Sequence, residues 1–185
     1  AYEIRNCDWS SDVCSSDLTG TYVDSDGLIK TAATNEARFD HNPTTGESLG
    51  LLVEEARTNL LLYSEQFDNA AWSKQNVNTT GTPSWVNVAV APDGTTTADK
   101  LIAASGTTRS YMGQINSNSS QKTVSFYAKA AEWSFVGIGY TNGAGIWSIA
   151  VFSLVTGQLQ NITQYSTPAI SSYTSTSVGN GWYRF

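Results

Sequence analysis

Short segments in which apolar and polar residues alternate recur along this chain, and turn-forming residues separate them. In residues 123–130, for example, Val124, Phe126 and Ala128 fall on one face of an extended strand. No long run repeats with the helical period, and Thr, Ser, Asn and Gly are abundant. Eight or more such segments predict an all-β protein, a jelly-roll β-sandwich of two antiparallel sheets preceded by a short β-rich arm.

The expected strands can be placed from apolar runs and turn residues. Residues 22–23 and 28–29 should form a hairpin around the tight turn at residues 24–27, and residues 38–40 a short strand. Residues 50–53 and 59–63 are predicted as buried strands joined by a charged connector. Further strands are expected at residues 72–77, 85–90, 98–103, 109–114, 123–130, 134–140, 145–154, 158–162 and 182–185.

Residues 1–18 look like a translated sequencing-library adapter. The codons TGG AGT TCA GAC GTG TGC TCT TCC GAT would encode residues 9–17 in order, so we exclude this segment from fold reasoning. The excluded segment contains both cysteines, Cys7 and Cys14, and we do not expect a disulfide between them. The remainder is interpreted as a metagenomic fragment cut at both ends, with a lead-in arm at residues 19–57 and a truncated sandwich at residues 58–185.

Charge and hydropathy exclude two classes of partner. Residues 1–18 contribute −3 of the formal net charge of −6, which leaves −3 on residues 19–185. A mildly acidic chain without a basic patch is not expected to bind nucleic acid. No apolar run approaches the roughly 20 residues that a membrane-spanning helix needs, so membrane insertion is not expected.

Four ordered segments resemble a known family. They are GLLVEEARTNLLLYSEQFDNAAW (residues 50–72), APDGTTTADKL (91–101), VSFYAKA (124–130), and FSLVTG with GNGWYRF (152–157 and 179–185). The set is similar to bacteriophage tail and other virion structural proteins that carry a concanavalin-like, carbohydrate-binding-module-like jelly roll. This resemblance implies a non-enzymatic tail or tail-fibre module, in the virion or extracellular, that binds host-surface glycan.

Two other functions stay open beside glycan binding. The first is a purely structural virion domain that packs against other subunits or against copies of itself, with a homotrimer as the expected assembly. The second is an accessory domain of a tail depolymerase. Because fold does not fix function, a choice among the three depends on the side chains that the chain offers to a ligand.

Aromatic side chains are the expected glycan contacts, since a ring can stack on the C–H face of a sugar while polar neighbours take its hydroxyls. Trp133 and Tyr140 border polar loops, where ligand contacts often lie. The alternative is that aromatics such as Trp72, Trp147 and Trp182 are ordinary core residues. The candidate ligand-binding residues are Arg109, Tyr111, Trp133, Tyr140, Asn142 and Trp147, with Gln114 and Tyr127 as further contributors.

A structural calcium ion is the one cofactor considered. Glu65, Asp68 and Asp99 are its expected carboxylate donors, with ordinary solvated surface residues as the alternative. His41 is the sole histidine, so a His-based metal or catalytic site has no partner. Glu132 stands nearly alone in the second half, which offers no carboxylate pair for glycoside hydrolysis. We therefore expect no enzyme activity and no catalytic residue.

Overall fold

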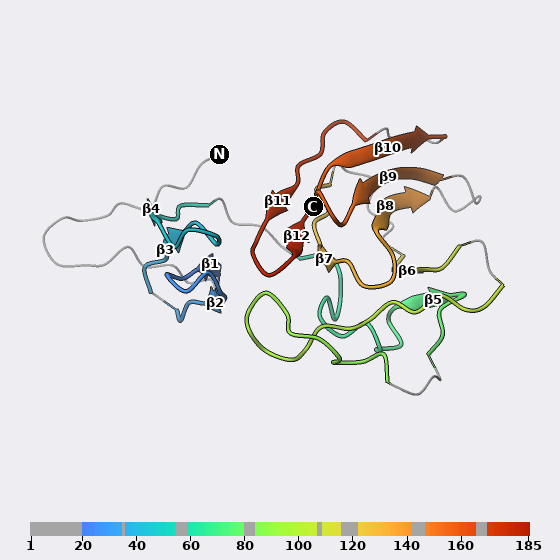
Figure 1. Cartoon of the computed structure of the whole chain (residues 1–185), viewed down its shortest axis with the longest axis horizontal. Coiled ribbons are helices and arrows are strands. Elements are labelled where there is room, and N and C mark those ends of the chain that lie inside the picture. The colour runs from blue at the N-terminus through green and yellow to red at the C-terminus, as the bar shows by residue number, and fades with distance from the viewer. Residues whose placement is uncertain are drawn as a thin grey trace, which may run out of the picture. The chain divides into compact units, whose positions relative to one another are not determined.

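The computed structural model describes residues 20–34, 36–54, 59–79, 84–106, 109–115, 122–141, 147–165 and 170–185 (Figure 1). These residues form twelve strands, β1 to β12, and no helix. The prediction of an all-β protein is therefore confirmed for the described part of the chain. Within the same ranges, no helix has the length and apolar character that a membrane crossing requires. The adapter-like segment, residues 1–18, lies outside the described residues.

Internal contacts divide the chain into two compact units, and each is described by itself. Unit 1 holds the described residues within Ala1–Tyr22, Leu28–Arg38 and Leu51–Gln121. Unit 2 holds those within Val23–Gly27, Phe39–Gly50 and Lys122–Phe185. The residues of the arm predicted at 19–57 are thus divided between the two units.

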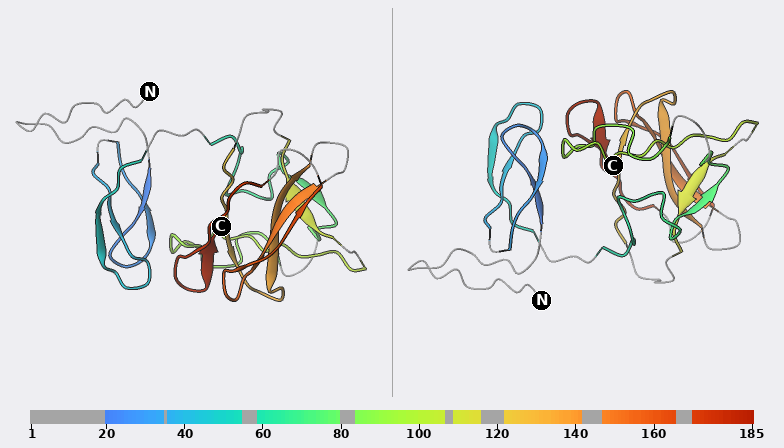
Figure 2. Two further views of the ribbon diagram at one scale, coloured as in Figure 1. Left: turned by 90° about the horizontal axis from the view of Figure 1, so that it is seen from above. Right: turned by 90° about the horizontal axis from the view of Figure 1, so that it is seen from below.

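Unit 2 contains two three-stranded antiparallel sheets (Figures 1 and 2). In the first, β9 (Trp147–Ser153) lies between β8 (Phe135–Thr141) and β10 (Leu159–Gln164). In the second, β12 (Trp182–Arg184) lies between β11 (Thr176–Ser177) and β7 (Tyr127–Lys129). The alternating burial along β8 and β9 is what the period of two in their sequence predicts.

One apolar core joins these sheets. Ala150, Phe152, Leu154 and Phe185 are buried, and the rings of Phe152 and Phe185 lie 4.6 Å apart. The partly buried side chains around them are Phe126, Ala128, Ala130, Val136, Ile138, Leu159, Ile162, Ile170 and Tyr183. Because these residues come from both sheets, the sheets pack together in a sandwich-like arrangement.

Two hairpins complete the arm region, β1 (Thr21–Val23) with β2 (Ile29–Thr31) and β3 (Phe39–His41) with β4 (Ser48–Leu51). The predicted turn between β1 and β2 is confirmed. Gly27 N–H donates to the Asp24 carbonyl over 3.0 Å, and Asp26 N–H donates to the Asp24 carboxylate over 2.9 Å. Asp24 thus closes the turn with both its backbone and its side chain.

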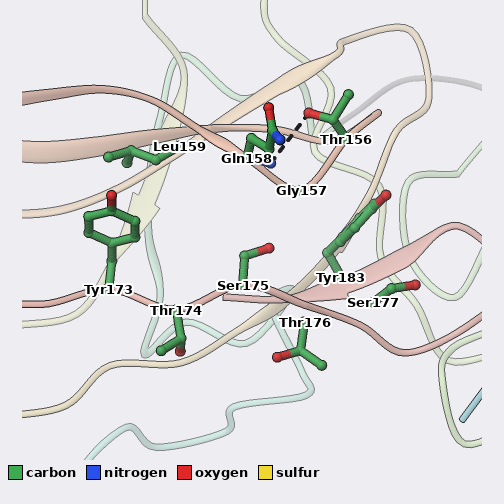
Figure 3. Close-up of a pocket in the computed structure, with 10 residues that line it drawn as sticks. All are labelled: Thr156, Gly157, Gln158, Leu159, Tyr173, Thr174, Ser175, Thr176, Ser177 and Tyr183. Atoms are coloured by element: carbon green, nitrogen blue, oxygen red, sulfur yellow. Dashed lines mark hydrogen bonds between the residues drawn. The ribbon is translucent and has the colours of Figure 1, made fainter. Parts of the chain in front are cut away.

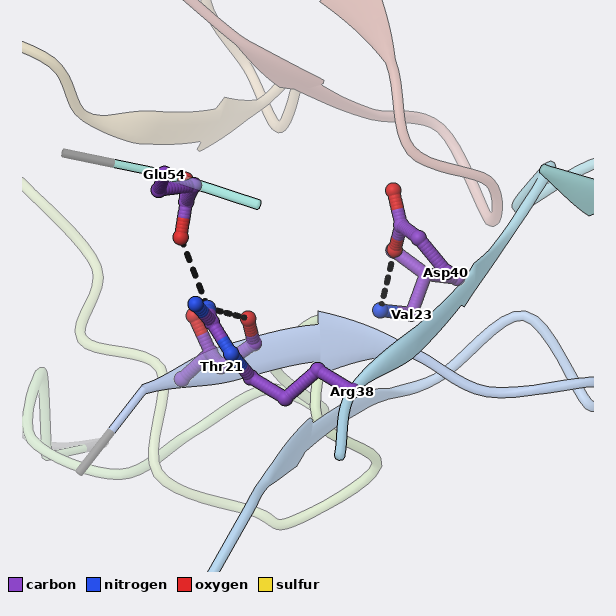
Figure 4. Close-up of polar contacts among 5 residues, drawn as sticks. All are labelled: Thr21, Val23, Arg38, Asp40 and Glu54. Carbon is purple, nitrogen blue, oxygen red and sulfur yellow. Dashed lines mark hydrogen bonds and ion pairs between the residues drawn. The ribbon is translucent and has the colours of Figure 1, made fainter. Parts of the chain in front are cut away.

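Polar side chains link the arm strands to one another (Figure 4). In unit 1, Arg38 Nη1 donates to the Thr21 carbonyl over 3.0 Å and contacts Glu54 Oε2 at 2.7 Å. In unit 2, Asp40 Oδ1 accepts a hydrogen bond of 2.8 Å from Val23 N–H. The arm is therefore held by side-chain contacts as well as by strand pairing.

Unit 1 has little regular structure beyond the arm. β5 (Ser73–Gln75) pairs with β6 (Tyr111–Gly113), and the isolated bridges Val77–Ala103 and Ala89–Ala98 are its other described pairings outside named strands. Trp72 and Trp85 are its large buried side chains, and each indole N–H donates to a backbone carbonyl. Two tryptophans and a series of turns thus organise this region.

The prediction of a buried strand at residues 59–63 is wrong. The segment runs through turns, Leu62 is 63% exposed, and Tyr63 has a φ of +53°, a left-handed conformation that is uncommon for a residue other than glycine and far from the extended backbone of a strand. Asn59 Oδ1 accepts from Leu61 N–H over 3.0 Å, a local bond that competes with strand pairing. The apolar run therefore does not become a buried strand here.

Three other strand predictions need correction. Of residues 50–53, only the first two belong to β4, which ends at Leu51; none of the four is buried, and Val53 is 81% exposed. Residues 85–90 and 98–103 form only isolated bridges, and Asn87 adopts a φ of +53° inside the first of these segments. A left-handed residue reverses the chain direction locally and interrupts the alternation that a strand requires.

Candidate functional site

The aromatic residues singled out from the sequence do not form one platform. In unit 2, Trp133 is 67% exposed in the connection between β7 and β8, Tyr140 lies near the end of β8, and Trp147 begins β9. Trp147 pairs with Thr141 across the sheet, so it shares a face with Thr141. Tyr140 precedes Thr141 and therefore points to the opposite face. A single sugar cannot stack on Tyr140 and Trp147 together.

Two of the other candidates belong to unit 1. Tyr111 begins β6 and is half-buried, while Arg109 is exposed and its carbonyl accepts from Asn76 Nδ2 over 2.9 Å. Asn142 lies outside the described residues. The five described candidates are thus divided between the two units.

Two further candidates make specific structural contacts. The Gln114 side-chain amide accepts from Leu62 N–H over 3.0 Å and donates to the Leu62 carbonyl, so it imitates a strand neighbour for that residue. Burial raises the pKa of Tyr127 above its ordinary value of 10.0, and the Arg184 guanidinium opposite it on β12 partly offsets this rise. Gln114 therefore stabilises unit 1, and Tyr127 is a partly desolvated phenol.

The proposed calcium donors do not gather. Among the described residues, no group of three or more His, Cys, Asp or Glu side chains could hold a metal ion. Asp99 instead accepts from Phe67 N–H over 3.2 Å and from Asn87 N–H over 2.8 Å, whereas Glu65 and Asp68 are exposed. Asp99 therefore cross-links two segments of unit 1. Calcium binding stays a prediction, and the described residues contain no carboxylate cluster that supports it.

Lys74 supplies a positive charge where unit 1 concentrates backbone carbonyls. Its ammonium donates to the carbonyls of Asp68, Asn69 and Trp72 over 3.2, 2.9 and 3.0 Å, and it lies 6.0 Å from the Trp85 ring centroid. An ammonium has three donors, and here three carbonyls accept them. An internal cation thus satisfies the carbonyls at the end of this turn.

A pocket in unit 2 gathers aromatic and hydroxyl side chains that sequence reasoning did not single out (Figure 3). We call it the tyrosine groove. It is open to solvent and has a volume of about 870 Å³. Its lining residues are Thr156, Gly157, Gln158, Leu159, Tyr173, Thr174, Ser175, Thr176, Ser177 and Tyr183.

The turn between β9 and β10 forms one side of the tyrosine groove. The buried Ser153 side chain accepts from the N–H groups of Val155 and Thr156, each over 3.2 Å. Gly157 N–H donates to the Ser153 carbonyl over 2.9 Å, and Gly157 has a φ of +74°. This conformation closes the turn, and it favours glycine because a glycine residue has no Cβ.

Tyr183 is held firmly at one end of the groove. Its hydroxyl donates to the Val155 carbonyl over 3.1 Å, and its ring lies 6.0 Å from that of Phe185 in the core. A Cβ on Gly157 would come within 2.5 Å of the Tyr183 ring, so the ring packs directly on the glycine backbone. Tyr183 is therefore a preorganised aromatic surface.

Tyr173 and Ser175 come from the extended segment that leads into β11. The Tyr173 side chain is 53% exposed, and its ring centroid lies 6.0 Å from that of Phe152, with the two rings in an edge-to-face arrangement. Figure 3 shows the Ser175 hydroxyl between the two tyrosines, on the side of the segment that faces Gly157. Two rings and a central hydroxyl thus face the same open space.

The sequence does contain a signal for this site. Residues 173–177, Tyr-Thr-Ser-Thr-Ser, are polar, and the Gly179-Asn180-Gly181 turn follows them. Positive φ values at all three turn residues reverse the chain and bring the segment beside β12. The run could have been recognised as hydroxyl-rich, but the aromatic partner Tyr183 and the facing turn at Gly157 come from elsewhere in the chain.

Comparisons of this chain with protein-family models, with curated proteins and with solved structures found no match. Interpretation of the site therefore rests on its chemistry.

Proposed function

We propose that this chain is a carbohydrate-binding module of the β-sandwich type. The observation that carries the proposal is the tyrosine groove, in which two tyrosine rings flank hydroxyl and amide side chains. Sugars need both kinds of contact, because a pyranose has apolar C–H faces and a rim of hydroxyls. Tyrosine supplies a rigid ring with little side-chain entropy to lose.

The structure of the groove favours binding without rearrangement. Tyr183 is fixed by its hydrogen bond to Val155 and by its packing on Gly157, so ordering this ring costs little on binding. Ser175 and Gln158 are polar residues from two different segments that line the groove. Each can both donate and accept hydrogen bonds, as a sugar hydroxyl also does.

The finer assignment is a non-enzymatic jelly-roll module of a phage tail or tail fibre, located in the virion or outside the cell. Its support is the resemblance of four ordered segments to that family. Two of these segments, residues 152–157 and 179–185, contribute Thr156, Gly157 and Tyr183 to the groove. The family resemblance and the groove therefore bear on the same part of unit 2.

Binding by the full chain to an immobilised glycan array tests the proposal, followed by titration of each positive glycan. Tyr173→Ala should weaken binding at least tenfold, about 1.4 kcal/mol, because it removes one ring from the groove. Tyr165→Ala is the matched control, since Tyr165 is 75% exposed in the same unit but does not line the groove. An array without any bound glycan, or equal losses in the two variants, would refute the proposal.

A structural role in virion assembly is the second candidate. Trp133, Phe135 and Val155 are all exposed, and the hydrogen bond from Leu154 N–H to the Ser134 carbonyl brings their segments together over 2.7 Å. Exposed apolar residues on neighbouring segments are typical of subunit contacts. Light scattering should then show a homo-oligomer, such as a trimer, that the double variant Trp133→Ser, Phe135→Ser converts to monomer. A monomeric parent chain would exclude this role.

A further inference from the structure

We infer that the tyrosine groove selects neutral saccharides and discriminates against acidic ones that carry carboxylate or sulfate. This inference rests on the proposed function and names its ligand class. None of the ten lining residues is Asp, Glu, Lys, Arg or His. The described residues that line the groove therefore offer hydrogen bonds and ring surfaces, and none of them has a charged side chain to pair with an anion.

The cations of the neighbouring strands lie on the face of their sheet opposite to Tyr183, a face that they share with the groove residue Thr176. Arg184 follows Tyr183 on β12, so the two side chains point to opposite faces. Arg184 pairs with Tyr127 across the sheet, and Lys129 pairs with Trp182, which places both cations on the face that Tyr183 does not share. An anionic sugar in the groove would find neither cation among the lining side chains.

Polar chemistry without charge is what makes the groove selective. A sugar hydroxyl that enters exchanges its hydrogen bonds with water for bonds to Ser175, Gln158 or Thr156, with little net cost. A carboxylate or sulfate gives up part of a much stronger hydration shell, and uncharged hydroxyls replace it incompletely. The penalty for an acidic substituent should therefore exceed the benefit of its hydrogen bonds.

The test compares matched probes on the full chain. The neutral probes are oligosaccharides of glucose, mannose, galactose and N-acetylglucosamine, and the acidic probes are oligogalacturonate and the sialylated and 6-sulfated forms of N-acetyllactosamine. We expect binding to at least one neutral class, a tenfold or greater loss for acidic probes, and a loss in Tyr173→Ala but not in Tyr165→Ala. Affinity for the neutral probe should change less than about twofold between roughly 0.05 and 0.5 M NaCl, because no ion pair is screened.

Gln158→Lys provides the converse test, since it places an ammonium at the groove. This variant should gain affinity for the acidic probe by about fivefold or more relative to the neutral one, and added salt should remove the gain. If the parent chain prefers acidic probes and Tyr173→Ala abolishes that binding, the inference of neutral selectivity is overturned while carbohydrate binding stands. If no probe of either kind binds, both fail.

Discussion

Unit 2 and unit 1 of this chain are stabilised in different ways. Unit 2 has two three-stranded sheets around a buried cluster that includes Phe152 and Phe185. Unit 1 relies on two buried tryptophans, short pairings, and side chains such as Gln114, Asp99 and Lys74 that bond to the backbone of distant or turning segments. Among the described residues, unit 2 uses three-stranded ladders, whereas unit 1 combines the short β5–β6 pair with side-chain bonds to its backbone.

The two units differ in how their backbone N–H and C=O groups are satisfied, by strand pairing in unit 2 and in part by side chains in unit 1. A strand pairs its own N–H and C=O groups, so its side chains are free to pack or to face a ligand. In a turn, some backbone N–H and C=O groups have no strand partner, and specific side chains have to form hydrogen bonds with them. In unit 1, two polar residues expected to bind ligand or metal, Gln114 and Asp99, bond to the backbone instead, whereas the candidate binding groove lies in the sheet-based unit.

The largest expected effect is on the unit 2 core. Phe152→Ala should lower the free energy of unfolding by about 3–5 kcal/mol, because it leaves a cavity among Ala150, Leu154 and Phe185. Phe135→Ala is the control, since Phe135 lies in the same sheet but is 57% exposed. Urea denaturation followed by tryptophan fluorescence measures both. Equal losses would mean that unit 2 is not organised around this core.

Alanine variants of two glycines with nearly the same φ distinguish the free-energy cost of backbone strain from that of packing. Gly157 in unit 2 (φ +74°) lies under the Tyr183 ring, whereas a Cβ on Gly106 in unit 1 (φ +75°) would meet nothing within 4 Å. Gly106→Ala should cost about 1–2 kcal/mol from the left-handed backbone alone. Gly157→Ala should cost about 1–3 kcal/mol more, because the ring must move. Similar unfolding free energies for the two variants would contradict the packing of Tyr183 on Gly157.

Lys74 tests the importance of side-chain-to-backbone bonds in unit 1. Lys74→Met keeps most of the apolar stem but removes the ammonium from three carbonyls, and it should cost about 1–2 kcal/mol. Lys129→Met is the control in unit 2, because Lys129 is exposed on β7 and its side chain makes no hydrogen bond among the described residues. Thermal unfolding of both variants decides the matter. A loss confined to Lys129→Met would reverse our view of the two units.

The smallest effect is a pH dependence in unit 2. Because burial raises the Tyr127 pKa above 10.0, the unfolded chain releases this proton first as pH rises. Stability from Tyr127 is therefore complete below about pH 10 and falls as pH approaches the folded-state pKa. Tyr127→Phe should show a shallower fall in unfolding free energy between about pH 9 and 11 than the parent chain. An identical fall would show that Tyr127 is not desolvated.

Prediction from sequence succeeded where alternation was long enough to fix a face. Residues 134–140 and 145–154 were expected as strands, and β8 and β9 occupy most of both segments. It failed for residues 59–63 and 85–90, where Tyr63 and Asn87 adopt left-handed conformations inside apolar or alternating runs. Apolar content says that a residue gains from burial, but it does not say whether a partner strand is available to receive it.

By itself, the sequence determined the all-β character of the described residues, the positions of most strands in unit 2 and the turn at Asp24–Gly27, since these follow from local alternation and turn chemistry. Only the tertiary structure decided that Tyr140 and Trp147 point to opposite faces, that Asp99 bonds to two backbone N–H groups, and that Tyr173 and Tyr183 share one groove. Strand register and the meeting of distant segments set these features, and neither is encoded within a short stretch of chain.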